Sequence, residues 1–305
     1  MTFKGRDIIS IRDFSKEDIL KVLDVAQKLE RRPQPTLMKG AVMGSLFFEP
    51  STRTRLSFTS AMEKLGGEVL GFEDAAVTSV QKGETLWDTI KMVNNYVDVI
   101  VQRHPVEGAA KLAANAADVP VINAGDGANQ HPTQTLLDLF TIQKEKGKLD
   151  GLNIGFVGDL KYGRTVHSLC MAMSHFRTKL FFVAPEALQM PEYYLADLQK
   201  KKIPYVVTAD LNKVAPQLDI LYMTRIQKER FPDPIEYNRL KDSFHINRQL
   251  LKITKKDVRI LHPLPRVNEI ATDLDDTPNA AYFRQAANGV PIRQALIALV
   301  TGRAA

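Results

Sequence analysis

One stretch decides the fold of this chain: Phe47-Phe48-Glu49-Pro50-Ser51-Thr52-Arg53-Thr54-Arg55-Leu56-Ser57-Phe58. The apolar run that leads into it, residues 41–48, predicts a buried strand. After it, apolar residues recur at helical spacing from Leu56 to Leu65, and Gly66-Gly67 ends the pattern. The strand therefore passes into the helix at residues 51–54. Such a junction offers unpaired backbone N–H groups and the positive end of the helix dipole, and both favour an anion.

The side chains of this junction add to the same preference. Arginine presents forked donors that match phosphate oxygens. The alternative is an ordinary helix start, with Ser51 as the N-cap and the arginines in surface ion pairs. The strand–turn–helix context favours the first interpretation, so we predict a phosphate-binding turn. Its hydroxyl and guanidinium groups belong to Ser51, Thr52, Arg53, Thr54 and Arg55.

Length and composition limit the classes of protein that fit this chain. Its 305 residues favour two domains, and its 44% hydrophobic residues exclude a disordered chain. The net charge of +6 admits nucleic acid or small anions as partners, but the absence of a long basic block favours small anions. The single cysteine, Cys170, excludes a disulfide framework and a cysteine zinc site within the chain. No signal peptide or membrane-length apolar run is found, so we expect a soluble, cytoplasmic protein.

Strands alternate with helices along the whole sequence. This predicts an α/β fold of two doubly wound domains, each with a parallel sheet flanked by helices. We place the domain boundary in or just after a helix over residues 133–147, so that the domains are residues 1–147 and 148–305. The predicted strands cover residues 41–48, 68–72, 97–102, 119–123, 153–157, 180–184, 205–208, 219–223 and 258–261.

Polar clusters follow the predicted strands at the points where the strands end. In parallel α/β sheets, ligands bind beyond the carboxyl ends of the strands. We therefore predict that the two domains form an arginine-rich cleft that takes small anions. The clusters are residues 51–55, Arg103, His131, Arg164, Arg225 with Gln227, and residues 263–266.

His131 has two interpretations. A lone histidine before a proline is more often structural than catalytic. Here a glycine-rich polar loop leads into it, and Gln134 lies at the same helix entry, where Pro132 suits the first turn. The loop favours a catalytic role for His131.

Six motifs together resemble the transcarbamoylase family along nearly the whole sequence. The first and third are shared across that family. The others match its aspartate-specific branch, because the ornithine branch carries a cysteine in the motif equivalent to residues 262–265 and this chain does not. The motifs are Phe47-Phe48-Glu49-Pro50-Ser51-Thr52-Arg53-Thr54-Arg55, Arg103-His104-Pro105, His131-Pro132-Thr133-Gln134, Gly158-Asp159-Leu160-Lys161-Tyr162-Gly163-Arg164-Thr165, Met223-Thr224-Arg225-Ile226-Gln227-Lys228-Glu229-Arg230 and His262-Pro263-Leu264-Pro265-Arg266.

The resemblance implies a reaction. The α-amino group of L-aspartate attacks the carbamoyl carbon of carbamoyl phosphate, and N-carbamoyl-L-aspartate and phosphate form, in pyrimidine biosynthesis. The main alternative is another transcarbamoylase, such as one that uses ornithine. Two acidic substrates need cations beside them, and the arginines at the strand ends supply these. The resemblance implies no metal or organic cofactor, and a C-terminal helix over about residues 289–303 that returns to the first domain.

The resemblance also implies a role for individual residues. Arg53, Thr54, Arg103 and His131 are the expected catalytic residues. The expected carbamoyl-phosphate site adds Ser51, Thr52, Gln134, Leu264 and Pro265 to those four. The expected aspartate site consists of Lys82, Arg164, Arg225 and Gln227. We predict structural roles for Arg55, His104, His262 and Arg266.

The expected oligomeric state depends on the loop that contains Lys82. By itself Lys82 reads as a solvated lysine in a polar loop. In the resembled family the equivalent loop enters the active site of a neighbouring subunit, which implies a homotrimer with shared active sites. The resemblance also admits separate regulatory chains. Neither nucleic acid nor a membrane is an expected partner; a non-catalytic nucleic-acid binder is favoured only by the sequence pI of about 9.2.

Overall fold

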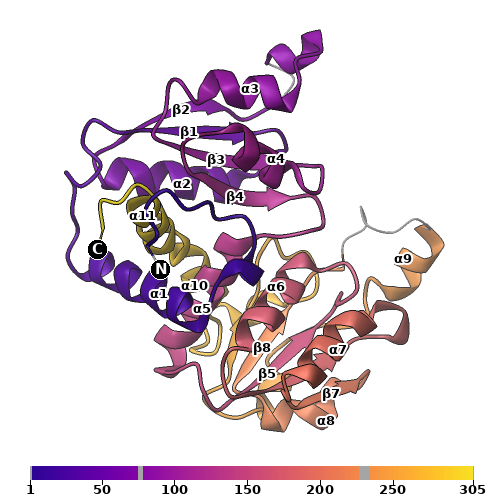
Figure 1. Cartoon of the computed structure of the whole chain (residues 1–305). Coiled ribbons are helices and arrows are strands. Elements are labelled where there is room, and N and C mark those ends of the chain that lie inside the picture. Colours follow the sequence, from indigo (N-terminus) through magenta and orange to yellow (C-terminus); the bar gives the residue numbers. More distant parts are fainter. Residues whose placement is uncertain (1, 75–77, 227–233, 305) are drawn as a thin grey trace. The chain divides into compact units, whose positions relative to one another are not determined.

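The computed structural model describes residues 2–74, 78–226 and 234–304. The chain divides into two compact units: unit 1 is Met1–Leu137 with Asn288–Ala305, and unit 2 is Asp138–Ala287. Within the described ranges, none of the helices combines the length and the apolar character needed to cross a membrane. Each unit has its own sheet (Figure 1). Each also has its own cluster of buried hydrophobic side chains.

Unit 1 is built on a parallel sheet with the strand order β2-β1-β3-β4. β1 is the strand predicted to precede the phosphate-binding turn, and it pairs with β2 and β3, so it lies inside the sheet. Buried apolar side chains on both faces of the sheet explain why β1 reads as a continuous hydrophobic run. The strands are β1 (Val42–Phe47), β2 (Glu68–Phe72), β3 (Val99–His104) and β4 (Val121–Asp126).

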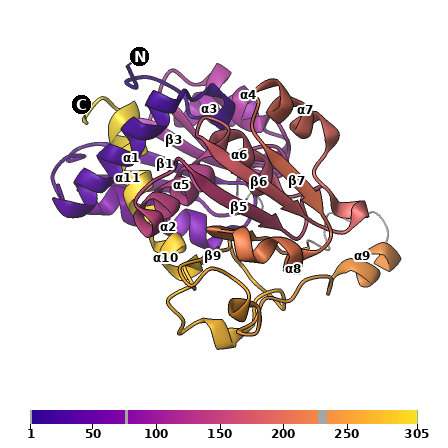
Figure 2. The ribbon, with the colours of Figure 1, turned by 90° about the horizontal axis from the view of Figure 1, so that it is seen from below.

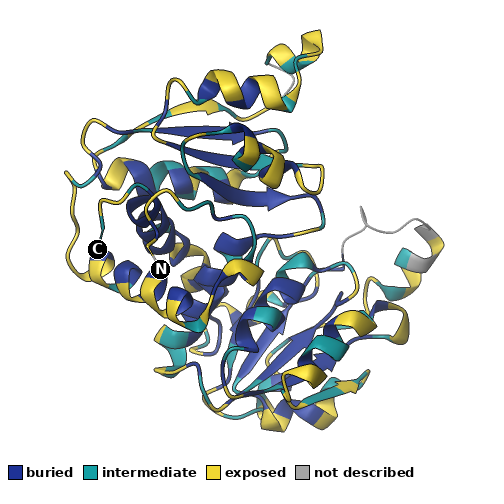
Figure 3. Ribbon diagram, viewed as in Figure 1, coloured by how far each residue is buried: buried dark blue, intermediate teal, exposed yellow. Residues whose placement is uncertain are grey.

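Helices cover both faces of this sheet (Figure 1). On one face, α3 (Leu86–Val93) and α4 (Ala109–Ala116) pack on Leu46 and Ile100 through small and branched side chains. On the other face lies α2 (Thr52–Lys64), which contacts α11 (Gly289–Val300). α11 also packs on α1 (Lys16–Arg31), and Figure 3 shows it buried along its whole length. The prediction that a C-terminal helix packs back on the first domain is confirmed.

Unit 2 is built on a second parallel sheet with the order β7-β6-β5-β8-β9. Its strands are β5 (Leu152–Val157), β6 (Thr178–Val183), β7 (Tyr205–Thr208), β8 (Ile220–Met223) and β9 (Arg259–Leu261). Its helices are the second half of α5 (Pro132–Lys146), α6 (Arg164–Met173), α7 (Glu192–Lys200), α8 (Leu211–Val214), α9 (Pro234–Leu240) and α10 (Tyr282–Ala287). The predicted α/β class with parallel sheets flanked by helices is confirmed for both units (Figures 1 and 2).

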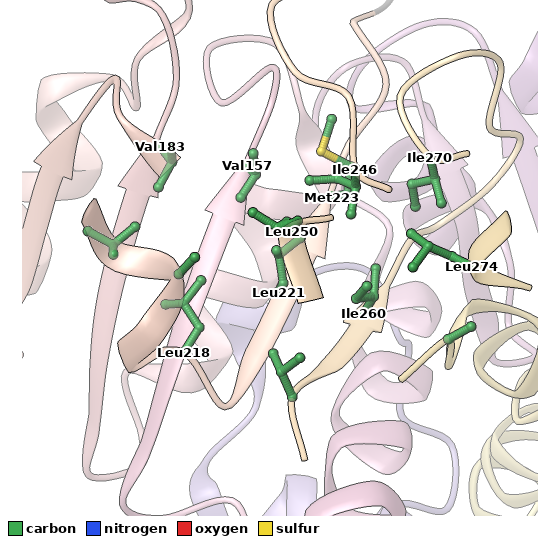
Figure 4. Close-up of a cluster of buried hydrophobic side chains, with 14 of the residues drawn as sticks. Val157, Val183, Leu218, Leu221, Met223, Ile246, Leu250, Ile260, Ile270 and Leu274 are labelled. Carbon is green, nitrogen blue, oxygen red and sulfur yellow. The ribbon is translucent and has the colours of Figure 1, made fainter. Parts of the chain in front are cut away.

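The main core of unit 2 lies on the face of the sheet that includes α8 and the segments around β9. Figure 4 shows Val157, Leu221, Met223 and Ile260 of the strands packed together with Leu250. On the opposite face, aromatic rings of neighbouring strands stack on one another, as in the pair Phe156 and Phe182, whose ring centroids are 5.7 Å apart. Both faces are therefore buried, which is the usual condition of a parallel sheet.

Two strands of unit 1 start and end later than the sequence predicts. The apolar runs of residues 97–102 and 119–123 mark their buried parts, but β3 extends to His104 and β4 to Asp126. The extension follows from pairing, because Arg103 lies opposite Phe47 and His104 opposite Asp126. Polar residues thus belong to the carboxyl ends of these strands and are held there by the ladder.

A charged cluster fixes the end of α5 within unit 2. Glu145 accepts a hydrogen bond from Nε of Arg284 at 2.6 Å and another from Nε of Arg259 at 2.8 Å. Burial by itself raises the pKa of Glu145, but the hydrogen bonds and charges of Arg284 and Arg259 outweigh it, so the pKa is lowered overall. A carboxylate whose pKa is lower in the folded chain stabilises the fold above its unfolded pKa, and this stabilisation is lost as the pH falls.

We expect Glu145→Gln to lower the free energy of unfolding of unit 2 at pH 7 by about 1–3 kcal/mol, because two partly exposed guanidinium groups lose a charged acceptor. The difference from the wild type shrinks as the pH falls below the pKa of an unfolded glutamate, about 4.3, and Glu145 becomes protonated. Urea denaturation at several pH values measures both effects. Asp197→Asn is the control, because the ion pair that Asp197 forms with Lys200 is exposed and long, at 3.8 Å. A difference that does not change with pH would contradict the assigned ion pairs.

Candidate functional site

In unit 1, β1 leads into the predicted phosphate-binding turn. Ser51 is the N-cap of α2, with φ −157° and ψ 91°, but its hydroxyl makes no capping hydrogen bond. The hydroxyl is therefore not committed to the helix, in contrast to the alternative of an ordinary N-cap. Thr54 is buried in the first turn of α2, and that turn holds no acidic residue. An anion at this helix end would meet no opposing carboxylate from α2 itself.

Arg103 stands at the end of the neighbouring strand β3. Its side chain is only 12% exposed. One guanidinium nitrogen lies 3.5 Å from Glu49 Oε1, and another donates to the carbonyl of Ala124 at 3.4 Å. Both contacts are long for a charged donor. They hold the guanidinium group at the carboxyl ends of β1, β3 and β4.

A buried carboxylate shapes the loop that leads from β4 to His131. Asp126 is 1% exposed. Its Oδ2 accepts the backbone N–H of Gly108 at 3.0 Å, and its Oδ1 accepts the backbone N–H of Gln130 at 3.1 Å. Gly127 in the same loop has a φ of +53°, and a Cβ there would lie 2.8 Å from the carbonyl oxygen of Pro105. The loop therefore needs both the aspartate and the glycine.

His131 is the residue at which this loop becomes helix α5. Its carbonyl accepts the backbone N–H of Gln134 at 3.0 Å, and Pro132 occupies the first helical position. The imidazole is buried, with Nδ1 at 3.5 Å from the Thr133 hydroxyl. His131 and Gln134 thus begin a helix at the carboxyl end of β4, which lies beside β3 and its Arg103; β1, which leads into the Ser51 turn, lies on the other side of β3.

In unit 2, a second buried aspartate shapes the loop between β5 and α6. Asp159 Oδ1 accepts the backbone N–H of Lys161 at 3.2 Å and that of Tyr162 at 2.9 Å. Its own backbone N–H donates to the hydroxyl of Thr224 at 3.1 Å. Thr224 follows β8 directly and precedes Arg225, while Arg164 is the first residue of α6. The Asp159–Thr224 contact thus ties together the two strand ends from which Arg164 and Arg225 extend.

The third strand end of unit 2 carries Leu264 and Pro265. β9 pairs with β8, so this loop emerges beside the one that bears Arg225. The Leu264–Pro265 peptide bond is cis, and Leu264 has a φ of +57°. The backbone N–H of Leu264 donates to Nδ1 of His262 at 2.8 Å. The positive φ is rare for a leucine, so the neighbouring contacts must hold this turn in place.

In each unit, the structure therefore groups predicted site residues at the carboxyl edge of that unit's sheet. In unit 1 these are Ser51, Thr52, Arg53, Thr54, Arg103, His131 and Gln134. In unit 2 they are Arg164, Arg225, Leu264 and Pro265.

Two predicted residues stand apart from these groups. Lys82 is exposed and ends a short 3-10 helix, Ser79–Lys82, that precedes α3. Gln227 lies outside the described residues.

Three residues predicted to be structural have partners that agree with such roles. Arg55 forms an ion pair with Glu73 at 2.6 Å, and Arg266 pairs with Asp275. His104 accepts the backbone N–H of Val106 at 3.0 Å, and burial lowers its pKa.

Two aspartates that shape the loops of the site are not predicted from the sequence. The sequence patterns assign no role to Asp126 or Asp159. The available signal is their context, since each follows a glycine at the end of a predicted buried strand. A carboxylate at such a position accepts the loop's backbone N–H groups.

Comparison with known proteins gives the family. The model of the aspartate/ornithine carbamoyltransferase carbamoyl-P binding domain matches residues 6–144, and the model of the Asp/Orn binding domain matches residues 150–300. This chain belongs to the aspartate/ornithine carbamoyltransferase family. The predicted family resemblance is thereby confirmed.

Individual members of the aspartate/ornithine carbamoyltransferase family are similar over nearly the full length. The aspartate carbamoyltransferase catalytic subunit of Thermococcus onnurineus is 56% identical, over 99% of both chains. The catalytic subunit of M. jannaschii aspartate transcarbamoylase is 51% identical, covers 96% of both chains and has a TM-score of 0.89. Aspartate transcarbamoylase from Trypanosoma cruzi, solved in complex with carbamoyl phosphate and aspartate, is 40% identical with a TM-score of 0.93, and the match covers 98% of this chain and 97% of that one.

Gly158, which precedes Asp159, gives a test of the loop geometry. It has a φ of +113°, and a Cβ would lie 2.3 Å from the carbonyl oxygen of Thr224. We expect Gly158→Ala to destabilise unit 2 by more than about 2 kcal/mol, because both the backbone conformation and the space are denied to alanine. Thermal or urea unfolding measures this.

Gly151→Ala is the matched control for that substitution. Gly151 also has a positive φ, +72°, but a Cβ there would meet only Lys148 Nζ at 3.7 Å. Gly151→Ala should therefore lower the free energy of unfolding only by the cost of the backbone strain, about 1–2 kcal/mol. Equal losses in the two variants would show that the close approach to Thr224 does not matter.

Proposed function

We propose that this chain is an aspartate carbamoyltransferase, which transfers the carbamoyl group of carbamoyl phosphate to the α-amino group of L-aspartate. The observation that carries the proposal is the 56% identity to a catalytic subunit of that name over 99% of the chain. The Trypanosoma cruzi relative binds both substrates in its solved complex. The products are N-carbamoyl-L-aspartate and phosphate, at a committed step of pyrimidine biosynthesis.

Unit 1 takes the carbamoyl donor in this proposal. The phosphate binds at the start of α2, where Ser51, Thr52 and Arg53 offer hydroxyl, backbone and guanidinium donors. The uncommitted hydroxyl of Ser51 and the absence of acidic residues in the first turn of α2 support this assignment. Gln134, with the backbone of Leu264 and Pro265, orients the carbamoyl nitrogen.

The chemical step follows from where charge develops. As the amino group attacks, negative charge grows on the carbamoyl oxygen and on the departing phosphate. Thr54, Arg103 and His131 donate hydrogen bonds to the oxygen, and Arg53 stabilises the phosphate. Neutral imidazole suffices for His131, since it acts as a donor. Removing one such donor typically lowers kcat by a factor of about 10²–10³.

Unit 2 takes the dicarboxylate acceptor. Arg164 and Arg225 bind the two carboxylates, together with Lys82 and Gln227. The support is that Arg164 and Arg225 follow neighbouring parallel strands whose ends are tied by Asp159 and Thr224. An ornithine site would instead need a carboxylate for the side-chain ammonium group.

Substitutions in the carbamoyl-phosphate site and in the aspartate site should change different kinetic constants. We expect Arg225→Ala to raise the KM for aspartate more than tenfold with a smaller change in the KM for carbamoyl phosphate, because it removes a charged hydrogen bond to one substrate. Arg53→Ala should lower kcat by about 10². Phosphate release and carbamoyl-aspartate formation, each measured with and without aspartate, report both. Arg55→Ala is the matched control, since Arg55 pairs with Glu73.

The same assay tests the function itself. Wild-type protein that releases phosphate with ornithine and not with aspartate would replace the proposal by the ornithine reaction. Salt-dependent binding of duplex DNA or RNA without phosphate release would replace it by nucleic-acid binding.

We also propose that the enzyme acts as a homotrimer in which Lys82 serves the active site of a neighbouring subunit. Unit 1 leaves large apolar side chains exposed near this segment of sequence, among them Trp87 at 42% and Tyr96 at 58%. Such side chains are common at contacts between subunits. The cytoplasmic location stays a prediction, as does the binding of separate regulatory chains.

Shared sites predict complementation. Lys82→Ala and Arg53→Ala chains should each be nearly inactive alone. Mixed trimers that contain both should regain activity, because some sites then receive an intact Lys82 and an intact Arg53 from different chains. Subunit exchange followed by the phosphate-release assay measures this. Inactive mixtures, after native mass spectrometry has verified mixed trimers, would remove the shared-site proposal.

A further inference from the structure

The loop of residues 262–266 is held by a buried network that the function proposed above does not use. Its centre is His262, which is 1% exposed, and its second member is Glu269, which is 3% exposed. Nε2 of His262 lies 2.8 Å from Oε1 of Glu269. Neither atom has another hydrogen-bond partner within the described part of the chain.

The contacts of His262 fix its protonation. Nδ1 accepts the backbone N–H of Leu264 at 2.8 Å, so it cannot carry a proton. The ring is therefore neutral, with its proton on Nε2, which faces Glu269. Burial lowers the pKa of His262, and the charges of Arg266 and Arg225 lower it further, against the opposing effect of Glu269. The environment thus agrees with the geometry in favouring the neutral ring.

Glu269 closes the network on its other side. Its Oε2 accepts the backbone N–H groups of Val267 and Asn268, both at 3.1 Å. The carboxylate therefore joins the segment after the loop to the histidine before it. Each of its two oxygens has a separate task, which an amide could not perform equally, because only one of its two ends accepts hydrogen bonds.

The backbone of His262 is anchored as well. Its N–H donates to Oε1 of Gln285 at 2.8 Å. Nε2 of Gln285 donates to Oδ1 of Asp138 at 2.6 Å, and the hydroxyl of Tyr222 donates to Oδ2 of Asp138 at 2.8 Å. All of these side chains are buried in unit 2. Neither the ring nor the backbone of His262 can move without breaking a buried hydrogen bond.

We infer that His262 and Glu269 are positioning residues that hold Leu264 and Pro265 in the conformation that binds the carbamoyl group. Leu264 has a φ of +57°, which a leucine does not adopt without support, and its backbone N–H is bound by His262. Glu269 keeps the acceptor nitrogen of His262 directed at Leu264 by holding the ring proton on the opposite nitrogen. The inference rests on the proposed function, in which Leu264 and Pro265 contact the carbamoyl donor.

Three substitutions separate this role from general stability. His262→Leu removes the acceptor for Leu264, and we expect the KM for carbamoyl phosphate to rise about tenfold or more, with less change in the KM for aspartate. His262→Asn keeps an acceptor oxygen near the position of Nδ1 and should restore most of the affinity. Glu269→Gln places an amide against His262 and the backbone, which favours a proton on Nδ1, so it should resemble His262→Leu.

A double variant makes the test sharper. In the His262→Asn background the ring and its tautomers are absent, so the part of the Glu269→Gln effect that passes through the ring should disappear. Equal KM values for His262→Asn and His262→Leu would overturn the inference. So would a Glu269→Gln effect that is the same in the wild-type and His262→Asn backgrounds. Far-UV circular dichroism and the melting temperature of each variant show whether it is folded.

Hydrogen exchange of the Leu264 amide tests the inference separately from the activity. It should be slow in the wild type and in His262→Asn, and at least about tenfold faster in His262→Leu and Glu269→Gln. If the wild type lacks carbamoyl transfer, the proposed function fails, and the exchange rates still decide whether His262 holds Leu264. Unchanged exchange in every variant would remove the positioning role, whatever the activity.

Discussion

Parallel pairing of strands is the constraint on which the rest of this structure depends. Because neighbouring strands run the same way, their carboxyl ends meet at one edge, and each edge collects the polar residues that follow several buried strands. In unit 1 this gathers the turn after β1, Arg103 and His131, which are dozens of residues apart in sequence. In unit 2 it gathers Arg164, Arg225 and the loop after β9.

Pairing alone does not give these edges a defined shape. Each loop that leaves a strand must satisfy its backbone N–H groups while it turns sharply, and buried acceptors do this in both units. Asp126 accepts a backbone N–H of the loop before His131, and Asp159 accepts one of the loop before Arg164. His262 accepts the backbone N–H of Leu264. His131, Arg164 and Leu264, which are proposed to contact substrate, thus follow or lie in loops whose backbone N–H groups bind buried acceptors. This arrangement limits the reorganisation needed when anions bind.

The sequence predicted the fold class because it follows from strong local patterns. The same patterns place the predicted site residues at the ends of strands. Apolar runs of strand length and the polar residues directly after them can be read without a structure. The ends of β3 and β4 could not be predicted in this way. Arg103, His104 and Asp126 join these strands through pairing with residues far away in sequence. The hydrogen bonds of Asp159 and Glu269 could not be predicted for a similar reason. Their partners are backbone N–H groups whose positions depend on the folded loop. His262 was predicted to be structural, and its burial agrees with that role. Its hydrogen bond with the backbone N–H of Leu264 shows which turn it supports.

Unit 1 is assembled from two separate segments of the chain, and this affects how the protein folds during its synthesis. Its core contains α11, a helix apolar on nearly every side that packs on both α1 and α2, and the backbone N–H of Gly5 is bound by the carbonyl of Val300. Unit 2 is continuous in the chain and ends at Ala287, before α11 begins. On the ribosome, all of unit 2 is therefore made while unit 1 still lacks its last helix. The part translated first is therefore completed only after unit 2 has been made, and the apolar surface of α1 and α2 stays open until α11 has left the exit tunnel.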